Sequence, residues 1–366
     1  MMKGITAMFL RFFPPPQFIS LEAVGVDVSD TSLKYMQFKK DGLLLKLGLW
    51  GDLKIPDGVV EQGVVKDVGA LGKVIAEVKK VTKAEFVRLS LPEERAYLFE
   101  TMVKRSLGSA EIYSAIEFSL EQNIPVSPRD AEFDYTPVLH SEHGGDSHVV
   151  VTAYTKETVL AYYDACKIAG VTPLSFEVEA QALARAVVPQ GDTGVSLIVD
   201  FGKTRTGIGI VENGILMFTS TVDLGGRHLD EALLAVYPSA TEEELIAMKN
   251  EHGVLRSAEL PKVYDALLEP VTTLKSELLA RLSYWSSRPE GTAHSVSRVI
   301  LCGGIANLAG LPDFLTEALG VPTEQADVWQ NAFSIDHDVP PITRRYSYGY
   351  ATAVGLALGS FLHDAV

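Results

Sequence analysis

LIVDFGKTRTGIGIVENG, the stretch at residues 197–214, contains two apolar segments separated by a short polar turn. The segments 195–200 and 206–211 are rich in β-branched residues, which favour strands. A turn is expected between them, and Asn213-Gly214 is typical of a tight hairpin that leads into a third strand at 215–222. The stretch therefore predicts an antiparallel three-stranded meander whose first strand ends at Asp200.

The beginning of the chain repeats this arrangement in VGVDVSDTSLKYMQF, residues 24–38. Its first predicted strand ends close to Asp27, a polar turn follows, and Asp41-Gly42 is again typical of a hairpin. Two meanders with the same spacing and the same strand-end acid indicate an internal duplication. The chain has 366 residues, which is more than one ordinary core usually holds, so two domains are expected.

The overall charge narrows the classes of protein to be considered. The net charge is −15 and the sequence has no run of lysine and arginine, which argues against nucleic acid as a partner. Cys166 and Cys302 lie far apart in apolar surroundings and are expected to be buried. Residues 1–20 contain an apolar segment that is too short to cross a bilayer. They are expected to form a flexible leader, or to lie on a membrane or on a partner.

Three loops follow strands that are expected to be buried, and each could close on an anion. The first follows Asp27, the second follows Asp200, and the third is Gly303-Gly304 after a strand at 298–302. Turns between strands can direct backbone N–H groups at a phosphate, and hydroxyl groups can add hydrogen bonds. The hydroxyl groups in these turns belong to Thr31, Ser32, Thr204 and Thr206.

The two strand-end acids and the paired glycines suggest what these loops bind. Mg²⁺ is usually held through one or two carboxylates, with water and phosphate completing its coordination. Asp27 and Asp200 could face each other across a cleft and hold this ion. Paired glycines let a flat ligand approach the backbone, so a nucleoside is expected at Gly303-Gly304. Each loop alone is better explained as an ordinary tight turn, but their order and the duplicated context favour a nucleotide site.

The quoted stretches resemble the PilM family of type IV pilus assembly proteins, relatives of the cell-division protein FtsA. SFEVEAQALARAV at 175–187, DLGGRHLDEAL at 223–233 and VILCGGIANLAGLPDFL at 299–315 carry the same resemblance. The two Asp-turns and the Gly-Gly loop are similar to the phosphate-1, phosphate-2 and adenosine motifs of the actin and sugar-kinase superfamily. The resemblance covers the chain from about residue 21 onward. It implies an α/β, actin-like (ribonuclease H-like) duplicated two-domain fold around an ATP cleft, with an inserted small α+β subdomain.

The resemblance also implies how the chain is divided. Residues 21–83 and 156–190 would form the first actin-like domain, and residues 191–366 the second, with a helical subdomain at about 225–295. Residues 84–155 would form the inserted subdomain. Within it, the apolar spacing predicts a helix at 110–122 and two paired strands after it.

ATP and Mg²⁺ are the cofactors that the resemblance implies, with Mg²⁺ held by Asp27 and Asp200 through water. The nucleotide-binding residues would be Asp27, Ser29, Thr31, Ser32, Lys34, Asp200, Gly202, Thr204, Thr206, Gly225, Gly226, Lys275, Glu277, Gly303, Gly304, Ile305 and Gly310. Lys34 is equally well explained as a solvated strand residue, and Lys275 and Glu277 are better explained as a solvated helix face. Asp200 and Asp223 are candidate catalytic residues, but no general base stands out, so at most a slow ATPase is expected.

A cytoplasmic position at the inner face of the cell membrane is a further implication of the resemblance. The partner would be the N-terminal peptide of a PilN-like inner-membrane protein, bound in a groove beside the inserted subdomain. Other platform or motor proteins of the pilus are further candidate partners, and self-association is another candidate contact.

Three positions depart from the family pattern. Ser29-Asp30 replaces the usual Gly-Ser, Gly207 stands where relatives often have Asp, and Asp230 stands where Thr is common. A carboxylate near a triphosphate is unfavourable unless a metal ion or Lys34 compensates it. The departures leave a nucleotide-free adaptor open as a second function. An FtsA-like filament former and, less favoured, a small-molecule kinase of the same superfamily stay open as well.

Overall fold

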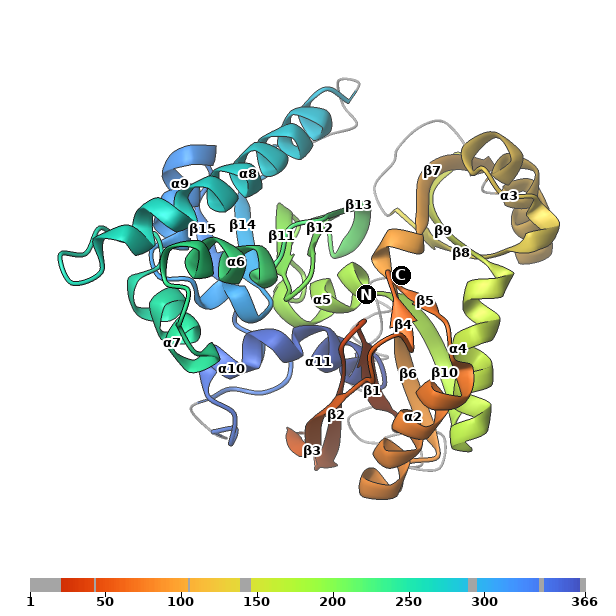
Figure 1. Ribbon diagram of the computed structural model, residues 1–366. Helices are drawn as coiled ribbons and strands as arrows, with labels where there is room; N and C mark the ends of the chain where they lie inside the picture. The colour runs from red at the N-terminus through yellow and green to blue at the C-terminus, as the bar shows by residue number, and fades with distance from the viewer. Residues whose placement is uncertain are drawn as a thin grey trace.

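The computed structural model describes residues 21–42, 44–104, 106–138, 146–288, 295–335 and 339–362. The predicted leader at residues 1–20 lies outside the described residues. Figure 1 shows two larger α/β halves that meet at the centre, and a smaller unit of strands and a helix beside the first half. Among the described helices, none combines the length and the apolar character needed to cross a membrane.

The first sheet contains the meander predicted at the beginning of the chain. Its antiparallel strands are β1 (Val24–Val28), β2 (Ser32–Asp41) and β3 (Leu44–Lys54). On the other side of β1, β6 (Phe86–Leu91) pairs parallel with it, and β10 (Thr172–Val178) pairs parallel with β6. The strand order is β10-β6-β1-β2-β3.

The second sheet has the same construction. The second predicted meander is β11 (Val195–Phe201), β12 (Thr206–Glu212) and β13 (Ile215–Val222), and β14 (Arg298–Cys302) and β15 (Thr323–Gln325) continue the sheet in parallel. The order β15-β14-β11-β12-β13 matches that of the first sheet strand for strand. Asn213 and Gly214 adopt φ angles of 54° and 78°, as a tight hairpin with two left-handed residues requires. The predicted duplication of the fold is therefore confirmed.

Two helices lie between the sheets at the centre of the molecule, α5 (Glu179–Val187) and α11 (Ala351–Leu358) (Figure 1). Every residue of α11 is buried, and glycines bring its backbone against both neighbours. A Cβ at Gly25 in β1 would lie 2.2 Å from the Ala353 carbonyl oxygen, and a Cβ at Gly355 would lie 1.7 Å from that of Ala182. The C-terminal helix thus packs against the first sheet, although the sequence grouped it with the second domain.

The remaining helices cover the outer faces. In the first half, α2 (Val68–Thr82) and α4 (Lys156–Ala169) pack against each other. In the second half, α6 (Gly226–Val236) and α9 (Leu311–Leu319) pack against the long helix α8 (Pro261–Ser286). The short helix α7 (Glu242–Ala247) continues into a π-helical turn, η4 (Met248–His252).

The smaller unit has a sheet and a hydrophobic core of its own. Its sheet contains β7 (Tyr97–Lys104), β9 (Asp146–Thr155) and β8 (Ala131–Pro137), with β9 in the middle. The helix α3 (Ser109–Asn123) packs on this sheet. The 3₁₀ turn η2 (Glu93–Arg95) connects β6 to this unit. The boundary predicted at residue 84 is too early, because β6 pairs with β1 and buries Val87, Leu89 and Leu91 in the main core.

Candidate functional site

A cavity of about 830 Å³ lies between the two halves, where the loops after β1, β11 and β14 come together. Most of the predicted site residues line this cavity. They are Asp27, Ser29, Thr31, Ser32, Lys34, Asp200, Gly202, Thr204, Gly226, Gly303, Gly304 and Ile305. Tertiary packing thus brings together three loops that the sequence placed in three separate segments.

The first loop is held in shape by its own serines. The Ser29 N–H donates to the Ser32 carbonyl oxygen at 2.9 Å, and the Ser29 hydroxyl accepts from the Ser32 N–H at 3.2 Å. The Lys34 ammonium group donates to the Ser32 hydroxyl at 2.9 Å. At the end of β1, Asp27 accepts a hydrogen bond from the Ser90 hydroxyl at 2.9 Å. These contacts direct Lys34 and Asp27 into the same part of the cavity.

The second loop is tied to the beginning of α6. The Gly226 N–H donates to the Gly202 carbonyl oxygen at 2.9 Å, and the Arg227 N–H donates to that of Lys203 at 2.8 Å. A Cβ at Gly225 would lie 2.5 Å from the Thr204 carbonyl carbon, so only glycine permits this approach. Gly225 therefore supports the loop from behind and does not line the cavity.

The third loop depends on Gly303, which has a φ of +81°. A Cβ at this position would lie 2.5 Å from an Asp200 carboxylate oxygen, so the glycine lets the end of β14 approach the end of β11. Gly304 begins the 3₁₀ turn η5 (Gly304–Asn307), and a Cβ there would meet no atom within 4 Å. The backbone at Gly304 is thus open to a ligand.

Four of the acids that line the cavity have a raised pKa. Burial raises the pKa of Asp200 to about 6, and the charge of Asp27 acts in the same direction. Burial also raises the pKa of Asp27, while Lys34 and the Ser90 hydrogen bond oppose this effect. Burial raises the pKa of Glu93 and that of Glu179 well above the ordinary value. A bound cation would relieve this crowding of buried acids.

The oxygen atoms of Asp27 and Asp200 are of the type that Mg²⁺ prefers. Across the described part of the chain, no three His, Cys, Asp or Glu side chains are grouped closely enough to hold a metal ion by themselves. An ion between the two loops would therefore be coordinated largely by water and by the phosphates of a ligand.

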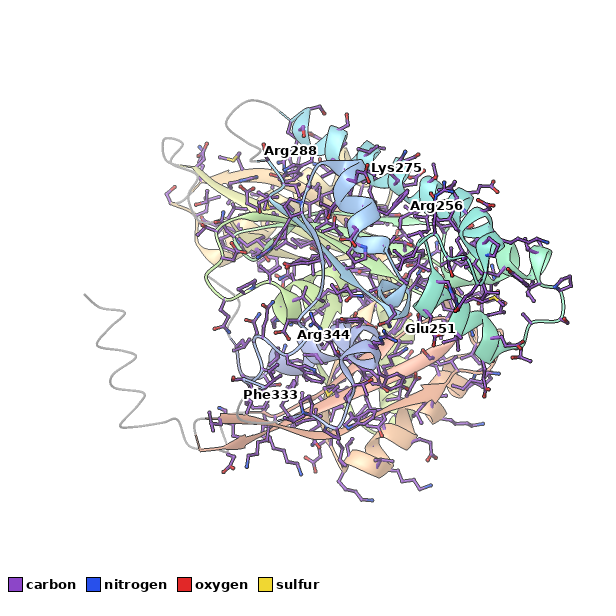
Figure 2. The ribbon with its side chains drawn as sticks, turned by 90° about the vertical axis from the view of Figure 1, so that its left-hand side faces the viewer. Glu251, Arg256, Lys275, Arg288, Phe333 and Arg344 are labelled. Carbon is purple, nitrogen blue, oxygen red and sulfur yellow. The ribbon has the colours of Figure 1, made fainter. Side chains whose placement is uncertain are left out.

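Some predicted residues lie away from the cavity. Lys275 and Glu277 belong to α8, where Glu277 pairs with Arg281. Figure 2 shows Lys275 near the upper edge of the molecule, far from Arg344 on α10 (Arg344–Ser347), the helix that borders the cavity. Among the helical segments between residues 240 and 290, α7 and η4 line the cavity instead. Lys275 and Glu277 were predicted because the resemblance to the superfamily implies that the long helix borders the nucleoside.

Three further predicted residues also lie outside the lining of the cavity. The Thr206 hydroxyl is buried and donates to the Leu224 carbonyl oxygen at 2.6 Å. Gly310 begins α9 with a φ of +77° and packs against Leu255. Asp223 is exposed and does not line the cavity.

Several lining residues were not predicted from the sequence. Glu93 lies in η2, and Glu179 is the first residue of α5. Lys249 and Asn250 come from the π-helical turn, and Arg345, Tyr346 and Tyr348 from the segment just before α11. Glu93 carries a sequence signal that was overlooked, since it follows a buried strand that runs parallel to β1 and ends at the same edge. Glu179 carries the same kind of signal, since it directly follows β10, which runs parallel to β6. The lining residues from η4 and from the segment before α11 have no comparable local pattern.

The structure supplies a partner for each of the three departures from the family pattern. Asp30 does not line the cavity, and its carboxylate accepts a hydrogen bond from Arg205 at 3.1 Å. The space beside Gly207 is taken by Glu93, whose Oε2 lies 2.4 Å from the Cβ that another residue would have. Asp230 pairs with Lys249. Arg205, and not the expected Lys34, compensates the extra carboxylate of the first loop.

Restoring an aspartate at position 207 is expected to destabilise this chain. Gly207→Asp would push the Glu93 carboxylate from its place beside Thr219, at a cost of about 1–3 kcal/mol of unfolding free energy. Combining it with Glu93→Ala should recover most of the loss, because the two positions compete for one space. Urea unfolding of both single variants and the double variant measures this coupling. Additive losses would contradict it.

Comparisons with known proteins agree with this geometry. The sequence model of the family described as Type IV pilus assembly protein PilM matches residues 25–361. In fold, the chain is similar to a solved structure described as a PilM-PilN type IV pilus biogenesis complex, with a TM-score of 0.76 and 23% identity. That match covers 94% of this chain and 100% of the other.

Two further solved structures share the fold at greater distance. The ethanolamine utilization protein EutJ from Carboxydothermus hydrogenoformans has a TM-score of 0.53 and 16% identity, with 94% of this chain and 90% of that chain covered. MreB5 of Spiroplasma citri, solved with ADP bound, has a TM-score of 0.50 and 12% identity over 84% of this chain and 92% of that one. The chain thus has the actin-like α/β fold in duplicated form.

Proposed function

Because the chain belongs to the family of type IV pilus assembly protein PilM, we propose that it is an ATP-binding component of the pilus assembly platform. It would work in the cytoplasm, at the inner face of the membrane, and bind the N-terminal peptide of a PilN-like membrane protein. The observation that carries the nucleotide part is the cavity at which three separate loops meet.

The nucleotide would lie across the three loops. Lys34 and the first two loops would receive the phosphates, and Gly303, Gly304 and Ile305 would border the nucleoside. Mg²⁺ would be held by Asp27 and Asp200 through water and would supply charge neutralisation for the phosphates. The placement of Asp30 supports this proposal, because the extra carboxylate is paired with Arg205 and does not line the cavity.

Hydrolysis would be slow at most. A general base must be able to accept a proton near neutral pH. Glu93 is a buried acid of the cavity, and burial together with the charge of Asp200 raises its pKa well above the ordinary value. Burial thus disfavours the charged form of Glu93, which is the form that accepts a proton. ATP would then act mainly by favouring one conformation of the cleft over another.

The partner part of the proposal rests on the family and on the similar structure solved as a PilM-PilN complex. The peptide groove would lie beside the smaller unit, where α4 contacts β8 and β9. This helix exposes Leu160 and Tyr163, which are 54% and 46% exposed and would offer apolar contacts to a peptide. Other platform or motor proteins, and a second copy of the chain, are further proposed contacts.

Titration calorimetry with ATP and Mg²⁺ tests the proposal that the cavity binds ATP. We expect saturable binding at one site that is weakened when EDTA removes the metal ion. The same protein is then titrated with a synthetic N-terminal peptide of the PilN-like protein, and a scrambled peptide serves as the control. Absence of binding up to millimolar ATP would overturn the nucleotide part and leave a nucleotide-free adaptor. Equal heats from both peptides would overturn the partner part.

A further inference from the structure

Arg205 belongs to the second half and forms ion pairs with two segments of the first half. It is the last residue before β12, and its guanidinium Nη1 lies 3.1 Å from Asp30 Oδ2 and 2.7 Å from Glu94 Oε1. Asp30 belongs to the first loop and Glu94 to the turn η2. One side chain of the second sheet is therefore held by two carboxylates of the first half.

The contact is well shielded from solvent. The side chains of Arg205 and Asp30 are each 18% exposed, and that of Glu94 is 16% exposed. Ion pairs in such positions are less screened by salt than surface pairs, and removing one partner leaves a poorly solvated charge. Removing Arg205 would leave two carboxylates of the first half without their cation and would remove the attraction that joins them to the second half.

Asp30 is anchored within the first half, and a second contact between the two halves lies next to Glu94, so the Arg205 contact is a bridge and not a loose surface pair. Asp30 also accepts hydrogen bonds from the N–H groups of Gln62 and Gly63, at 3.2 and 3.0 Å. In η2, the neighbouring Glu93 accepts from the Thr219 hydroxyl on β13 of the second sheet. Movement of one half away from the other must therefore break the Arg205 contacts.

We propose that Arg205, Asp30 and Glu94 form a clasp that holds the cleft between the two halves closed and sets how often it opens. The clasp lies beside the cavity, since Arg205 lines it and Asp30 does not. Opening by hinge motion exposes a cleft to its ligand. The clasp would thus control access to the cavity whatever ligand the cavity takes, and its test requires no nucleotide.

Spin labels on the two halves measure the closure directly. Lys73 on α2 and Glu243 on α7 are both exposed and can be replaced by cysteine, whereas the native Cys166 and Cys302 are buried. The distance distribution between the labels is recorded by pulsed electron paramagnetic resonance without ligand. Arg205→Gln is expected to shift it to longer distances. The matched control is Arg227→Gln, which removes an arginine from an exposed pair with Glu231.

Asp30→Asn provides a second variant of nearly the same shape, in case Arg205→Gln does not fold. It should shift the distribution in the same direction by a smaller amount, because Glu94 still holds Arg205. Circular dichroism establishes that each variant is folded. A distribution that matches the control in every folded clasp variant would overturn the clasp, even if ATP binding were demonstrated. A shift would support the clasp even if ATP did not bind.

Discussion

Asp200→Asn is expected to abolish most Mg²⁺-dependent nucleotide binding and, at the same time, to make the protein more stable at neutral pH. Asp200 lies at the end of β11, and burial and the charge of Asp27 raise its pKa from 3.8 to about 6. The charged form of Asp200 is thus unfavourable in the folded protein, but it is the form that binds a cation. Without it, affinity for ATP and Mg²⁺ should fall by about 100-fold or more.

The stability change follows from the direction of the pKa change. Because the folded protein holds this proton more tightly than the unfolded chain, the contribution of Asp200 to stability is fully present below about pH 4 and is lost as the pH rises through about 6. A pKa difference of one corresponds to about 1.4 kcal/mol, so the charge at pH 7 costs up to about 3 kcal/mol. The Asn variant removes this cost at pH 7 and should show little gain near pH 4.

Guanidinium unfolding at pH 7 and near pH 4, together with calorimetry, measures both effects. Asp41→Asn is the matched control, because Asp41 is exposed, is paired with Lys46 and lies away from the cavity. Its unfolding free energy and nucleotide affinity should stay close to those of the wild type. An Asp200→Asn variant that is less stable than the wild type at pH 7 would contradict the electrostatic account.

Gly355→Ala is expected to cause the largest loss of stability among these variants. The added Cβ would lie 1.7 Å from the Ala182 carbonyl oxygen and 2.5 Å from its carbonyl carbon, both backbone atoms of α5. On the β1 side, Gly25 lets the backbone of α11 approach equally closely, so α11 has no free direction in which to move. Overpacking usually costs about 1–3 kcal/mol, and a clash with fixed backbone should exceed this.

The yield of folded protein and urea unfolding test this expectation. Gly304→Ala is the control, because its Cβ would meet no atom within 4 Å and its φ is not in the left-handed region. The control should keep the stability of the wild type within about 0.5 kcal/mol. A Gly355→Ala variant that is equally stable would show that α5 and α11 are packed less closely than the backbone contacts indicate.

The two meanders could be read from the sequence because local interactions determine them. Alternating and β-branched residues favour strands, and Asn213-Gly214 adopts the left-handed conformations that a short hairpin needs. The repeat of this pattern, with an acid near the end of each first strand, then predicted the duplicated fold and the two loops that line the cavity. Each acid lies near the end of the first strand of its meander, which is why Asp27 and Asp200 could be predicted from the sequence, whereas the packing of the two sheets brings them to one cavity.

Which other residues line the cavity depends on contacts between segments that are distant in the sequence. Arg205 and Asp30 are 175 residues apart in the sequence, and no local pattern predicts that their side chains pair. Lys249 and Arg345 reach the cavity because of how η4 and α10 pack, whereas Lys275 and Glu277 on α8 do not line it. Local sequence therefore determined the strands, the turns and the acids at their ends. Only the packing of the two halves decided which charges meet across the cleft, because that depends on the close approach of backbones at residues such as Gly25, Gly303 and Gly355.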